Sequence, residues 1–190
     1  MILEENEIIT AIQQWVETFI VGMNLCPFAK RELVKNRVRF TVTDATTDDL
    51  LMTALQAELK LLDRDPSIET TLLIHPKVLQ DFYDYNQFLN FADRFLAELR
   101  LRGVYQIASF HPDYQFSGTD PDDAENYTNR SPYPLLHLLR EESLERVITD
   151  YPDTDQIPTH NIELMNRLGQ DKLQAFIQAC LDNPKPNAPK

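Results

Sequence analysis

Residues 70–76 (TTLLIHP) and residues 104–112 (VYQIASFHP) end in the same way. Each is a short run of β-branched, aliphatic or aromatic residues, which is typical of a buried strand, and each closes on a His-Pro pair. Proline has no N–H to donate to a β-ladder, so it ends the strand. The two stretches therefore predict two strands that finish alike, with His75 and His111 at their carboxyl ends.

Helical patterns surround these two strands. Apolar spacing of three or four residues predicts helices over residues 8–23, 47–62, 78–101 and 134–149, and a final helical pair broken at Gly169. Residues 37–43 (RVRFTVT) alternate and predict a further strand, and residues 114–118 are expected to add an antiparallel one. Alternating helices and strands imply βαβ crossovers. We expect an α/β fold with a small, largely parallel sheet of three to four strands, covered by helices, and a helical C-terminal segment.

Length and composition predict one acidic globular domain. The chain of 190 residues fits a single domain over residues 1–182, with a Pro- and Asp-rich linker at 151–159 and a disordered polar tail at 183–190. The net charge of −12 argues against a general nucleic-acid binder, and no apolar run approaches the length of a membrane span. The two cysteines form no CxxC pair, and the acidic N-terminus is unlike an export signal, so a cytoplasmic location is expected.

The two strand-end histidines are the first candidate site. If their strands run parallel, both imidazoles emerge at one edge of the sheet, where ligands bind in open α/β folds. They could work as acid and base, or bind a metal with a carboxylate such as Asp81, Asp84 or Asp113, although no tight ligand spacing supports a particular metal. Alternatively, each histidine only bonds to loop backbone.

Cys26 is the second candidate, in the stretch NLCPFAK at residues 24–30. A thiol held by proline after a helix, with Lys30 and Arg31 nearby, could have a lowered pKa and act as a nucleophile. A free cysteine between leucine and Pro-Phe is equally typical of a small buried hydrophobe.

The third candidate lies at the end of a long loop, residues 109–134, which contains four prolines and several aromatic residues. Asn129, Arg130 and Ser131 stand before a predicted helix start, a place that suits a phosphate or carboxylate. His137 and Arg140, three residues apart on that helix, could point toward the same ligand. Arg130 could instead pair with a nearby acidic side chain.

The stretches NLCPFAK, SFHPDYQFSGT and NRSPYPLLHLLRE resemble a domain-of-unknown-function family, number fourteen-fifteen, of bacterial and plastid proteins. The resemblance covers residues 4–181. It implies no particular activity, but it implies that the long loop is a defined part of the domain. With four glycines, the chain has no dinucleotide-binding, P-loop or nucleophile-elbow motif.

Two functions fit these observations. In the first, the protein is an enzyme acting on a small anionic metabolite, with His75 and His111 supplying acid–base or metal chemistry and Cys26 as an accessory thiol. Asn129, Arg130 and Ser131, with His137 and Arg140, would hold the anion, and the loop would be an ordered wall folded back over the ends of the strands. In the second, the aromatic, acidic loop binds a partner protein without catalysis. The sequence decides neither the cofactor nor the oligomeric state.

Overall fold

The computed structural model describes residues 5–150, 154–182 and 184. Its strands are β1 (Val38–Val42), β2 (Thr70–Ile74), β3 (Tyr105–Phe110) and β4 (Leu135–Arg140). Its α-helices are α1 (Glu5–Trp15), α2 (Ala29–Val34), α3 (Asp48–Arg64), α4 (Phe82–Glu98), α5 (Glu141–Asp150), α6 (Ile157–Leu168) and α7 (Gln170–Asp182). A π-helical turn η1 (Val16–Val21) continues α1, and short 3-10 helices form η2 (Ala124–Thr128) and η3 (Thr154–Gln156).

The four strands form one mixed sheet in the order β1-β2-β4-β3. β1 and β2 are parallel and are connected through α3, whereas β4 is antiparallel to both of its neighbours. The predicted α/β class is therefore confirmed, and the prediction of a largely parallel sheet is wrong. The two His-Pro strands, β2 and β3, run in the same direction with β4 between them.

The position of β4 is the main error of the sequence prediction. Residues 135–140 (LLHLLR) were predicted to be helical, and the antiparallel strand was expected at residues 114–118, which form no strand. A central strand is buried on both faces, so its apolar run loses the alternation that marks a strand and matches helical spacing equally well. The placement of His137 and Arg140 on one helical face was wrong for the same reason.

Local signals fix the helices on either side of β2. The side chain of Thr47 accepts a hydrogen bond from the backbone N–H of Leu50 and caps α3. Asp81 accepts hydrogen bonds from the N–H groups of Tyr83 and Asp84, at 2.8 and 3.2 Å, and caps α4. Gly169, with a φ of 79°, separates α6 from α7 where the sequence predicted the break.

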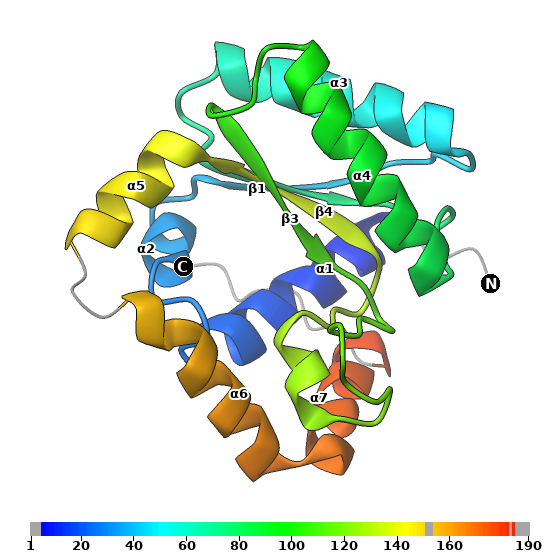
Figure 1. Cartoon of the computed structure of the whole chain (residues 1–190), viewed down its shortest axis with the longest axis vertical. Helices are drawn as coiled ribbons and strands as arrows, with labels where there is room; N and C mark the ends of the chain where they lie inside the picture. Colours follow the sequence, from blue (N-terminus) through cyan, green and yellow to red (C-terminus); the bar gives the residue numbers. More distant parts are fainter. Residues whose placement is uncertain (1–4, 151–153, 183, 185–190) are drawn as a thin grey trace.

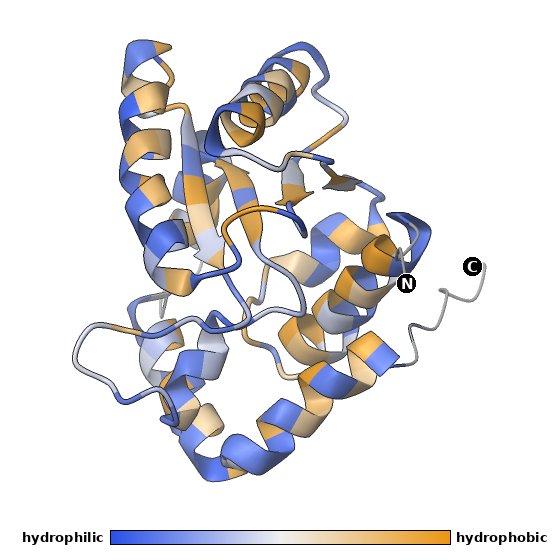
Figure 2. Cartoon of the chain, turned by 90° about the vertical axis from the view of Figure 1, so that its right-hand side faces the viewer, coloured by the Kyte–Doolittle hydropathy of each residue, from blue (hydrophilic) through white to orange (hydrophobic). Residues whose placement is uncertain are grey.

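Helices cover both faces of the sheet and make a three-layer sandwich (Figure 1). On one face, α3 and α4 bury a core that includes Leu55, Tyr85 and Phe88. On the other, α1, η1, α6 and α7 bury a second core that includes Trp15 and Phe19. Hydrophobic and hydrophilic residues alternate along the helices of both layers (Figure 2), and the buried positions of α1, α3 and α4 are mostly the apolar ones. Each fully buried large side chain contributes roughly 1.5–3 kcal/mol, so the two cores hold the sheet from both sides.

The long loop has a defined internal structure. Asn126, which is fully buried, accepts hydrogen bonds from the Phe116 N–H and the Thr119 hydroxyl and donates one to the Asp120 carbonyl. Asn129 binds both the carbonyl of Ser109 and the N–H of His111 at the end of β3. The carbonyl of Pro134 accepts from the N–H of His75 at the end of β2. The predicted fold-back over the two strand ends is thus confirmed.

Two predicted segments fall on undescribed residues. The linker expected at 151–159 has its first three residues outside the described part of the chain, and from Thr154 onward the backbone is already helical. The tail predicted at 183–190 lies outside the described residues except for Pro184. Within the described part of the chain, none of the helices is both long and apolar enough for a membrane span.

Candidate functional site

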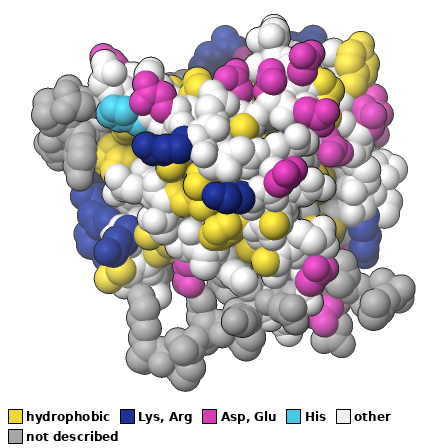
Figure 3. Space-filling model, turned by 90° about the horizontal axis from the view of Figure 1, so that it is seen from below, with side chains coloured by type: hydrophobic (Ala, Val, Ile, Leu, Met, Phe, Trp, Pro, Cys, Tyr) yellow, Lys and Arg dark blue, Asp and Glu magenta, His cyan; other side chains and the backbone are white. Residues whose placement is uncertain are grey.

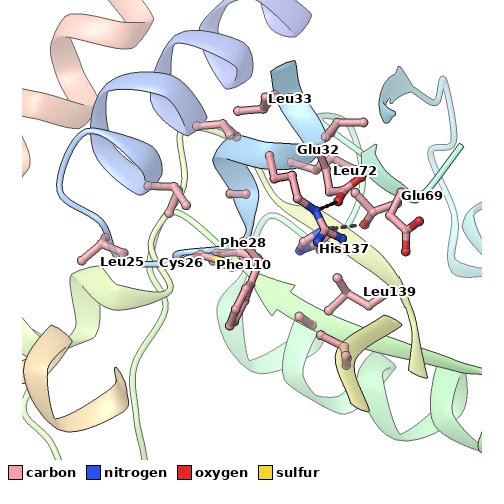
Figure 4. A pocket seen from close by; sticks show the side chains of 18 of the residues that line it. Leu25, Cys26, Phe28, Glu32, Leu33, Glu69, Leu72, Phe110, His137 and Leu139 are labelled. Atoms are coloured by element: carbon pink, nitrogen blue, oxygen red, sulfur yellow. Dashed lines mark hydrogen bonds and ion pairs between the residues drawn. The ribbon is translucent and has the colours of Figure 1, made fainter. Parts of the chain in front are cut away.

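A cavity of about 330 Å³ lies between the sheet and the segments that contain α1, η1, α2 and α5. Its walls are mainly apolar and include Trp15, Leu25, Phe28, Leu72 and Phe110. This volume lies at the lower end of the range for small-molecule sites, which are mostly apolar with a few placed polar groups. Figure 4 shows that Glu32, Glu69 and His137 group toward one end, while Leu25, Cys26 and Phe28 lie toward the other.

Strand alternation puts these side chains in the cavity. In β4, Leu135, His137 and Leu139 project to the face covered by α1, and in β2 the same face carries Thr70 and Leu72. The strand neighbour of His137 in β3 is Ala108, which also lines the cavity. Because alanine fills little of the space opposite the imidazole, room remains between the sheet and the helices.

His137 has one defined tautomer. The Thr70 hydroxyl donates its single proton to the Leu138 carbonyl at 2.6 Å, so its oxygen must accept in the 2.7 Å contact with His137 Nε2. Nε2 therefore carries the ring proton and Nδ1 has the lone pair. No hydrogen bond to Nδ1 is seen among the described residues, and His137 lines the cavity. Burial lowers the pKa of His137 to about 4, so the ring is neutral near pH 7.

A chain of ion pairs forms the charged rim beside His137. Glu32 accepts from Arg31 at 2.6 Å and from Arg37 at 3.3 Å, and Arg37 also pairs with Glu69 Oε2 at 2.5 Å. The other carboxylate oxygen, Glu69 Oε1, is buried and has no hydrogen-bond partner within the described structure. The indole N–H of Trp15 is also buried without a partner there. Buried polar atoms are normally paired, and these two belong to residues that line the cavity, so both could form a hydrogen bond with a molecule there.

Arg140 also lines the cavity, but its guanidinium is occupied. It donates to the carbonyls of Leu62, Asp65 and Ile68 and to the hydroxyl of Tyr105. These bonds tie the end of β4 to the turn between α3 and β2. Arg140 therefore has an evident structural role that needs no ligand.

The remaining predicted residues divide between the cavity and the loop. Cys26 is half-buried and lines the cavity together with Asn129. Arg130 and Ser131 are not in its walls. The Arg130 guanidinium donates to the carbonyls of Tyr114 and Pro121, at 3.1 and 2.7 Å, and lies over the ring of Tyr127. The hydroxyl of the fully buried Ser131 donates to the carbonyl of Tyr133.

His75 and His111 lie at the same edge of the sheet, one strand apart, as predicted. Both rings pack against Tyr85, with ring centroids 5.7 and 5.1 Å away, and neither side chain is exposed. His75 Nδ1 donates to the carbonyl of Val78. His111 Nε2 donates to the carbonyl of Leu79, and its Nδ1 accepts from the Asp113 N–H. We call these three residues, His75, Tyr85 and His111, the strand-end cluster.

The strand-end cluster consists of neutral groups. Burial is the main cause that lowers the pKa of His75, to about 4, and burial also lowers the pKa of His111. Tyr85 donates to the carbonyl of Leu135 and accepts from the N–H of Phe110, so it joins β4 to β3. Among the ring nitrogens of the cluster, His75 Nε2 has no hydrogen-bond partner in the described structure.

Of the carboxylates expected as metal ligands, Asp81 and Asp113 lie close enough to His111 for their charges to oppose the lowering of its pKa by burial. Asp81 is used as the cap of α4, and no group of three or more His, Cys, Asp or Glu side chains able to hold a metal occurs among the described residues.

Sequence reasoning missed Trp15, Glu69 and Thr70. Trp15 reads as one more apolar position of the first helix, and Glu69 and Thr70 stand at the start of a strand without any motif. The strand register, which pairs Thr70 with the C-terminal end of β4, brings Thr70 and the preceding Glu69 to the end of the cavity at His137, and the packing of α1 on the sheet adds Trp15 to the walls.

These features define a small α/β sandwich protein with a cavity sized for a small molecule. The chain belongs to the family described as protein of unknown function DUF1415, whose sequence model matches residues 7–175. Searches find no match among curated proteins and none among solved structures.

Proposed function

We propose that this protein binds a small, mainly apolar molecule in the cavity beside β4, with the polar end of the molecule at His137. The observation that carries the proposal is the coexistence of apolar walls with polar atoms that lack partners in the described structure, Glu69 Oε1 and His137 Nδ1. Imperfect packing alone would not be expected to leave a histidine fixed in one tautomer in the wall of an apolar cavity.

The proposed site is the cavity at His137 and not the first candidate site, which was formed by His75 and His111. His75 and His111 are sealed from solvent and bonded to loop carbonyls, whereas His137 borders a space that a ligand can occupy. Arg130 and Arg140 direct donors to backbone carbonyls, so they give little support to an anionic ligand. We also propose a cytoplasmic location, which the two free cysteines support.

The partner-binding alternative has weaker support. Tyr127 is buried, and Tyr114 packs against Phe82 and Phe116 instead of projecting outward. Figure 3 shows that, on the lower face, apolar side chains gather near the centre but are interrupted by basic ones, with acidic side chains toward one side. A protein-docking core would be more continuous and depleted of charge.

Binding can be tested with the neutral fluorescent probe N-phenylnaphthylamine. Its emission should rise with wild-type protein, and bound probe should slow alkylation of Cys26 by iodoacetamide while the buried Cys180 stays unlabelled. Ala108→Leu fills the cavity and should abolish the emission rise. Ala97→Leu, on the exposed side of α4, is the matched control and should leave the rise unchanged. Equal probe binding in Ala108→Leu and wild type would refute this location.

A further inference from the structure

We infer that the cavity selects a ligand whose head group donates hydrogen bonds, such as a neutral hydroxyl or N–H, and discriminates against a carboxylate. This inference rests on the proposed binding function and specifies the ligand class. It is the opposite of the anionic ligand that the sequence alone suggested.

The first support is the direction of the hydrogen bonds at His137. The Thr70 hydroxyl is committed to the Leu138 carbonyl, so the imidazole proton stays on Nε2. Nδ1 then offers a lone pair to the cavity and cannot donate while the ring is neutral. Because burial favours the neutral ring, the ligand must supply the proton of this hydrogen bond.

The second support is Glu69. One of its oxygens is held by Arg37, and the other, Oε1, is buried without a partner in the described structure. A carboxylate oxygen accepts hydrogen bonds only, so it too requires a donor from the ligand. Figure 4 places Glu69 and His137 at the same end of the cavity, so donors of one head group or its immediate neighbours can serve both.

The third support is the state of the nearby cations. Arg37 is divided between Glu32 and Glu69, and Arg140 donates to backbone carbonyls and Tyr105. Arg31, which also lines the cavity, is likewise engaged with Glu32. A ligand carboxylate would therefore meet Glu69 where each of these three guanidinium groups of the described residues already has an acceptor, in an apolar space where an unpaired charge is costly. The indole N–H of Trp15 can serve an acceptor atom in the ligand, but a single neutral donor does not compensate for a buried charge.

The inference is tested by ligands with one aromatic body and three head groups. Naphthol donates, methoxynaphthalene only accepts, and naphthoate is anionic. In competition with N-phenylnaphthylamine, naphthol should displace the probe at a concentration about tenfold lower than either of the others, as expected for one additional good hydrogen bond.

Two adjacent threonines provide a matched pair of variants. Thr70→Val removes the acceptor of the Nε2 proton and frees the ring to exchange tautomers, so the preference for naphthol should shrink severalfold. Thr71→Val changes a neighbouring buried hydroxyl that has no partner among the described residues and faces the opposite side of the sheet. The Thr71→Val variant should show the same preference for naphthol as the wild type.

Each outcome separates this inference from the proposal on which it rests. Equal displacement by all three compounds, or strongest displacement by naphthoate, would overturn the inference while leaving the binding cavity in place. An unchanged preference in Thr70→Val would overturn the tautomer argument. Failure of the probe to bind wild-type protein would reject the binding proposal and the inference together.

Discussion

The strand-end cluster and the cavity at His137 both contain neutral histidine side chains, but only His137 faces a space that a ligand could enter. In both regions burial keeps a histidine neutral, with a pKa near 4 for His75 and for His137. In the cluster, the rings are sealed and donate to the loop after β2. In the cavity, one nitrogen is fixed by Thr70 and the other faces space. A lowered pKa therefore does not identify a site; access to the lone pair does.

The difference also explains why the His-Pro pairs looked functional. A histidine after a strand has both a donor and an acceptor with which to bind the irregular backbone that follows. His111 uses both, toward the Leu79 carbonyl and the Asp113 N–H, and its role in the fold is thereby accounted for. His137 lies in mid-strand, where the sequence offers no comparable signal, and it is the one beside the cavity.

Acidification should give the largest loss of stability, and the buried histidines of both regions should contribute to it. Unfolded histidine titrates near 6.5, so between about pH 6.5 and pH 4 the unfolded chain binds more protons than the folded one. Stability must then fall as pH falls. From pH 7 to pH 5 we expect a loss of about 2 kcal/mol for each of His75 and His137, measured by urea unfolding.

Two variants separate these contributions. His75→Gln and His137→Gln should each remove about 2 kcal/mol of the pH-dependent loss, whereas only His137→Gln should reduce naphthol binding. A flat stability profile between pH 7 and pH 5 would contradict the neutral buried state of both rings.

Tyr85→Phe tests the strand-end cluster alone. The variant leaves the Leu135 carbonyl and the Phe110 N–H without their side-chain partner in a buried position, so unfolding free energy should fall by about 3 kcal/mol. The control is Tyr83→Phe on the exposed side of α4, where a change below about 0.5 kcal/mol is expected. Probe binding should persist in Tyr85→Phe under native conditions. Its loss there would show that the two regions are coupled.

Arg130→Ala should give the smallest effect and tests the loop between the two regions. Loss of two hydrogen bonds to the Tyr114 and Pro121 carbonyls should lower unfolding free energy by about 1–2 kcal/mol without weakening probe binding. Arg102→Ala removes an exposed ion pair with Asp93 and should cost less than about 1 kcal/mol. Unchanged stability together with lost ligand binding would restore the ligand-holding role predicted for Arg130.

Features of the fold that depend on neighbouring residues could be predicted before the structure was known. The bounds of β2, a threonine cap of α3 at Thr46 or Thr47, the break at Gly169 and the closing His-Pro pairs all follow from local backbone preference or hydrogen bonding, and the structure selects Thr47 as the cap. The fold-back of residues 109–134 was also predictable, because a loop with four prolines and several aromatics loses less entropy and gains apolar contacts when it is ordered.

The position of the candidate site, in contrast, depends on contacts between residues that are far apart in the chain. LLHLLR fits a helix or a central strand equally well, and burial between β2 and β3 selects the strand. That choice places His137 beside Thr70 and opposite Ala108, residues far apart in the chain, and it opens the cavity there. The role of Arg130 also depends on nonlocal contacts, because the carbonyls that accept its hydrogen bonds are positioned by the folded loop. Spacing along a sequence can predict a strand end, but strand register determines which lone pair remains for a ligand.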